Sequence, residues 1–273
     1  MSRTLCAVLV MAVLASACSS GTEPAPTTTT TAAAPAAPTV GEQLVARLSA
    51  ERWDADCISL LDEALAVAQT VVDTADPLTH EQFAHQSETI IRDFDPLQAD
   101  LAARFDELGC SQFWWDITLV DRSETLTSSS IAGFITRFSF LEASVSNIAQ
   151  EYGPAVGLMV KPETPPVLPD EPERPTFSSC DDVFDALLTF QIYQVDLADH
   201  LATLPAAPPE GYDEFAAEYT AATQSFADEN SCDPVAAAQH IIANEQLLDP
   251  NNVYGSFAKY VALGAALRQA DFA

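Results

Sequence analysis

Positive charge is scarce in this sequence, and that scarcity excludes one class of partner. The 273 residues include 11 lysines and arginines against 40 aspartates and glutamates, which gives a formal net charge of −29. A surface of this sign repels phosphate backbones, so we expect no nucleic-acid partner. It allows a cation, or a basic protein or peptide of the cell envelope, whose binding would weaken as the salt concentration rises.

The sequence also lacks the motifs that mark most active sites. It has no glycine-rich phosphate loop, no G-x-S-x-G segment and no recognisable order of catalytic serine, histidine and aspartate. We therefore expect neither enzyme activity nor a cofactor. A C-x-x-C pair is missing too, which disfavours a metal site built from four cysteines.

The apolar run at the start of the chain, Leu5 to Leu14, is too short to span a bilayer. It follows Arg3 and leads through small residues into Cys18. Residues 1–17 resemble the lipobox signal peptide of bacterial prolipoproteins, although Ala15 stands where that family usually has leucine. The resemblance implies that Cys18 is lipidated and anchors the chain to the extracytoplasmic side of the cell membrane. Ordinary secretion after cleavage is the alternative.

Residues 18–39 have the composition of a tether. They hold five consecutive threonines, Thr27 to Thr31, and otherwise mostly alanine, proline and serine. No apolar pattern in them could form a core, so we expect disorder. A flexible coil of this length spans roughly 25 Å. The signal and tether together are similar to those of actinobacterial lipoproteins.

The rest of the chain has the pattern of an all-α protein, because apolar residues recur at helical spacing and no stretch alternates as a strand would. The first module covers residues 40–151. A helix over 57–75 is followed by Thr79, whose capping box with Gln82 begins a second helix. That helix should end at Gly109, since glycine readily takes the left-handed conformation of a helix end.

Prolines mark the remaining boundaries between the predicted helices and between the two modules. Pro96 lies inside the second helix, where we expect a kink or break. Helices over 112–126 and 129–150 complete the first module. Seven prolines within 152–176 predict an extended connector, which leads to a second helical module over 177–273.

The second module repeats the first at an offset of 123 or 122 residues, which predicts an internal duplication. The span from Cys57 to Cys110 has its counterpart in the span from Cys180 to Cys232. Other matched positions are Asp62 and Asp185, Leu65 and Leu188, Val72 and Val195, Asp76 and Asp199, Gly133 and Gly255, and Leu141 and Leu263. We expect an internally duplicated bundle of two four-helix modules, joined through a pseudo-two-fold contact.

The four cysteines of these modules are predicted to form two disulfides. An exported chain meets an oxidising compartment, which favours disulfides over free thiols. Four cysteines allow three pairings, among which spacing alone does not choose. A helical hairpin that goes out and returns places Cys57 beside Cys110, and the repeat places Cys180 beside Cys232. We therefore expect one disulfide in each module.

The predicted second helix carries the one set of side chains in the sequence that suggests metal binding. Glu81, His85 and Glu88 share a helix face, whereas His80 lies five residues from His85 and cannot complete a zinc motif that needs a spacing of four. The element His85-x-x-Glu88 is similar to one in imelysin-like iron-uptake proteins. That resemblance implies a metal-binding or metal-delivery lipoprotein as the alternative function. The competing interpretation is a solvated face on which Glu88 pairs with Arg92.

Aromatic and basic residues supply the candidate contacts for a bound partner. Trp114 and Trp115 follow Phe113, and three adjacent rings cover about 200° of a helix, so one can reach the surface. Burial between the modules is the competing explanation. Arg137 and Lys259 keep a positive charge at a matched position, either for a ligand carboxylate or for an acidic neighbour. The leading functional hypothesis is an envelope binding module with a groove between the two copies.

Overall fold

The described part of the chain is mostly helical. The computed structural model describes residues 40–160, 168–202 and 208–269. No residue in these ranges belongs to a strand, so the predicted all-α fold is confirmed. The predictions that lie outside the described residues are the signal peptide, the lipidation site and the tether (1–17, Cys18 and 18–39).

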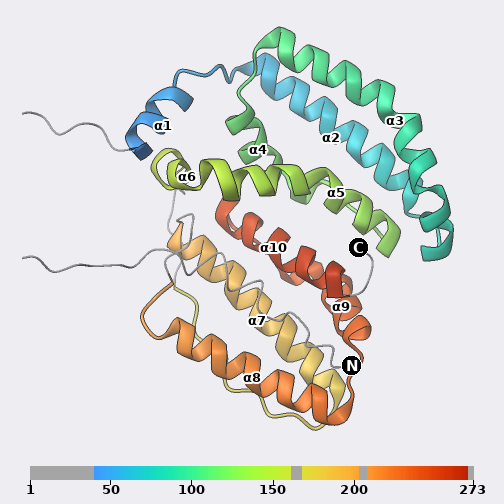
Figure 1. Cartoon of the computed structure of the whole chain (residues 1–273), viewed down its shortest axis with the longest axis vertical. Helices are drawn as coiled ribbons and strands as arrows, with labels where there is room; N and C mark the ends of the chain where they lie inside the picture. The colour runs from blue at the N-terminus through green and yellow to red at the C-terminus, as the bar shows by residue number, and fades with distance from the viewer. Residues whose placement is uncertain (1–39, 161–167, 203–207, 270–273) are drawn as a thin grey trace, which may run out of the picture.

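Helices α1 to α6 form the first half, which occupies the upper part of Figure 1. Their bounds are Val40–Leu48, Ala55–Ala75, His80–Leu108, Gln112–Asp121, Ile131–Asn147 and Gly153–Met159. A 3-10 turn, η1, follows α4 over Ser123–Thr125, and a π-helical turn, η2, follows α5 over Ile148–Tyr152. The sequence predicted continuous α-helices over 112–126 and 129–150. In the structure, η1 and η2 lie at the C-terminal ends of these two segments.

Helices α7 to α10 form the second half, in the lower part of Figure 1. Their bounds are Cys180–Leu201, Tyr212–Asn230, Pro234–Ala243 and Val253–Gln269, with a 3-10 turn, η3, over Glu245–Leu247. The order of two long helices, a short helix, a 3-10 turn and a long helix therefore occurs in both halves. Helices α5 and α10 pack against each other where the halves meet. The recurrence is what a duplication would produce, and the duplication itself stays a prediction.

Each half has one disulfide that joins the start of its first long helix to the end of its second. Cys57 is bonded to Cys110 with their Cα atoms 5.7 Å apart, and Cys180 to Cys232 with 5.5 Å. Both predicted pairings are confirmed. Each pair of helices runs out and back over similar lengths, which brings its two cysteines together.

Local signals at the ends of α3 are also confirmed. The Thr79 hydroxyl accepts a hydrogen bond from the Gln82 amide at 3.2 Å, and the Gln82 side chain accepts one from the Thr79 amide at 2.9 Å. Gly109 ends the helix with a φ of 66°, in the left-handed region that glycine enters without steric cost.

The two proline-based expectations have different outcomes. α3 runs unbroken through Pro96, and in Figure 1 it curves around α2. The expected break is therefore absent, and the curved course of α3 is compatible with the expected kink. The connector predicted to be extended from 152 is instead helical over α6. Ala155 and Val156 are fully buried there, and α6 packs against α1, so burial of apolar side chains prevails over the proline content.

A carboxylate at the end of the first long helix organises the start of the last helix in both halves. Asp76 accepts hydrogen bonds from the amides and hydroxyls of Ser129 and Ser130, at 2.8 to 3.1 Å. A Cβ atom on Gly133 would stand 1.7 Å from this carboxylate, so no larger residue fits. The aspartate therefore holds α2 against the start of α5.

Asp199 repeats this arrangement in the second half. It is fully buried and accepts from the amides of Asn251, Asn252 and Gly255, at 2.5 to 3.0 Å. A Cβ atom on Gly255 would again meet the carboxylate, at 2.3 Å. Burial raises the pKa of Asp199, and the three amide donors oppose that rise.

Two ion pairs cross between the halves in a reciprocal way. Arg137 on α5 pairs with Glu245 in η3, and Lys259 on α10 pairs with Glu124 in η1 at 2.8 Å. Arg137 and Lys259 are matched positions, and each takes its partner from the other half. The rings of Phe138 and Tyr260, the next matched residues, lie 6.5 Å apart between the two helices. This pattern has the symmetry of an isologous interface, as a pseudo-two-fold contact requires.

Candidate functional site

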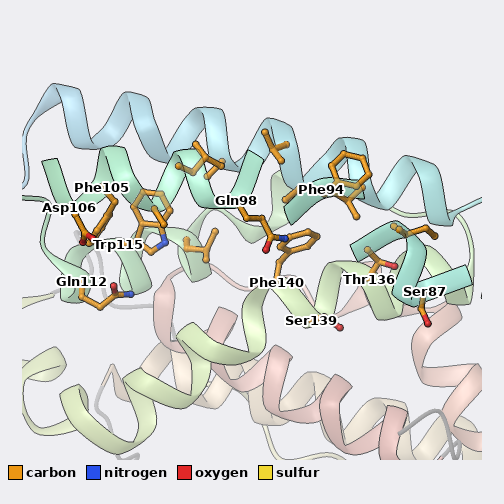
Figure 2. Close-up of a pocket in the computed structure, with 18 of the residues that line it drawn as sticks. Ser87, Phe94, Gln98, Phe105, Asp106, Gln112, Trp115, Thr136, Ser139 and Phe140 are labelled. Carbon is orange, nitrogen blue, oxygen red and sulfur yellow. The ribbon is translucent and has the colours of Figure 1, made fainter. Parts of the chain in front are cut away.

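A half-open cavity of about 700 Å³ lies in the first half, between α2, α3, α4 and α5 (Figure 2). The lining is mainly apolar: Ala64, Val67, Ala68, Val71, Phe83, Ile90, Phe94, Leu101, Ala102, Phe105, Trp115, Leu119 and Phe140. The polar lining residues are Ser87, Gln98, Asp106, Gln112, Thr136 and Ser139. The sequence predicted a groove between the two copies, whereas this cavity belongs to one of them.

Five aromatic rings surround the cavity. Phe83, Phe94 and Phe105 come from α3, Trp115 from α4 and Phe140 from α5. The three phenylalanines are eleven residues apart, which is close to three helical turns, so they project from one face of α3. The Phe105 ring meets Trp115 edge to face, with centroids 5.2 Å apart. This spacing was the signal in the sequence that could have located the site.

Small side chains on α2 leave the space that these rings surround. Val67 lines the cavity, and its counterpart 123 residues later is Phe190 on α7. Phe190 is buried and stacks on Tyr219 of α8, with ring centroids 5.0 Å apart. An aromatic stack thus occupies the seam between the two long helices of the second half, whereas the corresponding seam of the first half is hollow.

Most of the polar lining residues lie at the two ends of the cavity, whereas Gln98 lies between them near Phe140, as Figure 2 shows. Asp106 and Gln112 lie near Trp115 at one end, and both are exposed. Thr136 and Ser139 lie at the other end, where their hydroxyls already donate to backbone carbonyls of α5 at 2.9 Å. Asp106 is the one ionisable residue among the lining residues that the structure describes.

A buried carboxylate fixes the wall beside the acidic end. Asp116 is 1% exposed and accepts hydrogen bonds from Gln112, Ser144 and Asn147, at 2.6 to 3.0 Å. Burial raises the pKa of this carboxyl, and the three donors partly oppose the rise. The network ties α4 to the last turn of α5, directly before the π-helical turn, and so positions Gln112 at the cavity.

α3, the outer wall, packs along α2, and further attachments hold its C-terminal end. The disulfide and a hydrogen bond from the Arg52 guanidinium to the Leu108 carbonyl, at 2.7 Å, hold its C-terminal end. An ion pair between Arg104 and Glu63, 2.8 Å long, joins it to α2 near the same end. Hydrogen bonding between the two raises the pKa of Arg104 and lowers that of Glu63, although both side chains are partly exposed.

The residues predicted to contact a partner lie in different environments and do not form one site. Trp115 lines the cavity, whereas Trp114 packs partly buried against the core and the Phe113 ring. Arg137 and Lys259, 4% and 2% exposed, lie in the reciprocal ion pairs. Each of these two positive charges therefore pairs with an acidic neighbour and not with a ligand carboxylate.

The three residues proposed as metal ligands lie on the solvent face of α3. Glu81, His85 and Glu88 are all exposed. Within the described ranges, no group of three or more histidine, cysteine, aspartate or glutamate residues is placed to hold a metal ion. None of the described helices has both the length and the apolar character needed to cross a membrane.

No protein-family model, no curated protein and no solved structure matches this chain. Function is therefore inferred from the geometry and chemistry of the cavity.

Proposed function

We propose that this protein is a lipid-anchored binding protein of the cell envelope, which holds an apolar small molecule in the cavity between α2, α3, α4 and α5. A volume of about 700 Å³ falls in the range typical of small-molecule sites. The lining is also typical of such sites, with aromatic and aliphatic side chains over most of the surface and a few polar groups among them. We assign the protein no reaction.

The contrast between Val67 and Phe190 is the observation that carries the proposal. Both halves use the same order of helices, the same disulfide and the same aspartate at the end of the first long helix. A chain that only needed a stable core could fill both seams alike, because an unfilled apolar cavity costs stability. The first half keeps the space between its two long helices open, although the second half fills the matched space with aromatic rings. This difference supports a function for the cavity.

The location is proposed from the sequence of residues 1–39. The signal segment, Cys18 and the tether support a chain that hangs from a membrane by its lipid. The two disulfides are what an oxidising, extracytoplasmic compartment favours. The metal-delivery alternative has no comparable support in the described residues.

Filling the cavity is expected to abolish apolar binding without unfolding the chain. The double substitution Ala64→Leu/Val67→Phe installs the residues found at the matched positions of the second half, Leu187 and Phe190. We expect the Kd of an apolar fluorescent dye to rise at least about tenfold, which is 1.4 kcal/mol. The thermal midpoint should stay level or rise as the void is filled.

The matched control is Ala66→Leu, which adds a similar volume on the exposed face of α2. It should leave dye binding unchanged. Equal dye affinity in the filled variant and in the wild type, with both folded, would contradict the proposal.

Membrane attachment is expected to depend on the single thiol of Cys18. In detergent phase separation of cells producing the full chain, the wild type should enter the detergent phase and Cys18→Ala should enter the aqueous phase. Two or three lipid chains supply many buried methylenes at roughly 0.8 kcal/mol each, so the shift should be nearly complete. A Cys18→Ala variant that stays in the detergent phase would refute the anchor, and a soluble, shortened wild type would identify ordinary secretion.

A further inference from the structure

The cavity is long and narrow, which restricts the shape of its ligand. Its lining residues on α3 run from Phe83 to Asp106, a distance of about 35 Å at 1.5 Å per residue. A volume of about 700 Å³ spread over that length, with the radius of a water molecule added on every side, gives an average cross-section of roughly 50 Å². A peptide helix of about 10 Å diameter needs roughly 80 Å². The cavity therefore suits an extended hydrocarbon chain and not a helix of a partner protein.

The charge distribution restricts the end group of that chain. Asp106 is exposed at the end where Gln112 lies, and no cationic residue is among the lining residues described. The nearby guanidinium of Arg104 is already paired with Glu63 at 2.8 Å and lies 3.8 Å from Asp100. An anionic head placed at this mouth would meet an unneutralised carboxylate, whereas a cationic head would pair with it.

The opposite end offers no competing charge partner. The Thr136 and Ser139 hydroxyls donate to carbonyls within α5, and Ser87 is neutral. A charged head at that end would lose hydration without gaining an ion pair. The head is therefore expected at the Asp106 end, with the chain running from Phe105 towards Phe94.

We propose, as an extension of the binding function above, that the ligand is a single-chain amphiphile with a cationic head. Its hydrocarbon chain lies between α2 and α3, and its head lies beside Asp106 and Gln112. A neutral head is tolerated and an anionic head is disfavoured. The protein would thus select by charge as well as by apolar character.

The test compares three ligands that share one chain. Hexadecylamine, hexadecanol and hexadecanoate, each below its micelle concentration, displace the apolar dye from the full mature chain at neutral pH. We expect the amine to bind about tenfold more tightly than the carboxylate, because one head is attracted to Asp106 and the other repelled. Shortening the alkylamine by one methylene should weaken binding about fourfold.

Asp106→Asn should reduce the tenfold preference to about twofold while leaving the affinity for hexadecanol unchanged. Glu107→Gln is the control, because Glu107 is an exposed neighbour that does not line the cavity. Both substitutions are at exposed positions, and unchanged thermal unfolding verifies the fold.

The outcomes separate the two proposals. Dye that binds but is not displaced by any alkyl ligand overturns the ligand class and leaves the cavity function standing. Equal or tighter binding of the carboxylate, or a preference that survives Asp106→Asn, overturns the head assignment. A wild type that binds neither dye nor alkyl ligand refutes the proposed function itself.

Discussion

Removing the Cys57–Cys110 disulfide by the double substitution Cys57→Ala/Cys110→Ala is expected to lower the free energy of unfolding by about 4 kcal/mol. The bond closes a loop of sequence separation 53, and its loss releases that loop in the unfolded chain. It also removes the covalent hold on the C-terminal end of α3, the outer wall of the cavity. Urea denaturation followed by tryptophan fluorescence measures the change, since Trp53, Trp114 and Trp115 all lie in the first half.

The second disulfide supplies the control. Cys180→Ala/Cys232→Ala removes a bond of separation 52 and should cost about the same stability. It should leave the affinity for the apolar dye unchanged, whereas the first double substitution should weaken it because the cavity wall is released. Equal effects of both double substitutions on dye binding would show that the cavity wall does not depend on its own disulfide.

Breaking one reciprocal ion pair is expected to cost about 3 kcal/mol of unfolding free energy. Glu245→Ala leaves the guanidinium of Arg137, which is 4% exposed, without its carboxylate. Its bond to the Leu126 carbonyl, at 2.9 Å, and its contact with the Phe134 ring offset only part of this loss. Thermal and urea denaturation of the variant give the value.

Two comparisons decide whether the buried charge is the cause. Glu142→Ala removes an exposed carboxylate from the same helix as Arg137 and should change stability by less than about 0.5 kcal/mol. Arg137→Met/Glu245→Leu removes both charges and should recover most of the lost stability, since an apolar pair of similar volume often replaces a buried ion pair at little cost. A double variant as unstable as Glu245→Ala would mean that packing, and not the unpaired charge, explains the loss.

Features governed by neighbouring residues could be predicted from the sequence. The capping box of Thr79 with Gln82 and the helix end at Gly109 depend on contacts within three or four residues. The disulfide pairings followed from helix lengths and from the repeat, because a hairpin returns the chain to its starting point. Pro96 does not break its helix, because α3 carries apolar lining residues on both sides of it.

Features governed by distant residues could not be predicted in the same way. Glu245 and Glu124 lie 108 and 135 residues from their partners Arg137 and Lys259, so the sequence showed the repeated charge but not its partner. The cavity depends on the summed volumes of side chains on four helices, which no single periodicity contains. The spacing of Phe83, Phe94 and Phe105 showed an aromatic face but could not show that α2 opposite it carries small residues.

The two halves show that one arrangement of helices can enclose either a packed aromatic stack or a cavity. The disulfide, the aspartate and the glycine beside it are shared, and they set the positions of the long helices. Side-chain volume then decides what lies between those helices, as Val67 and Phe190 show. A binding site can therefore be present in one half without any change in the order of helices.

Photochemical labelling of the folded chain tests the central claim most directly. Hexadecylamine with a diazirine in its alkyl chain would be irradiated with the full mature protein, and the modified peptides would be mapped by mass spectrometry. The account predicts adducts on α3 and on the Trp115 and Phe140 peptides, with these adducts lost in Ala64→Leu/Val67→Phe. Adducts spread over the exposed surface, or concentrated on α7 and α8, would contradict it.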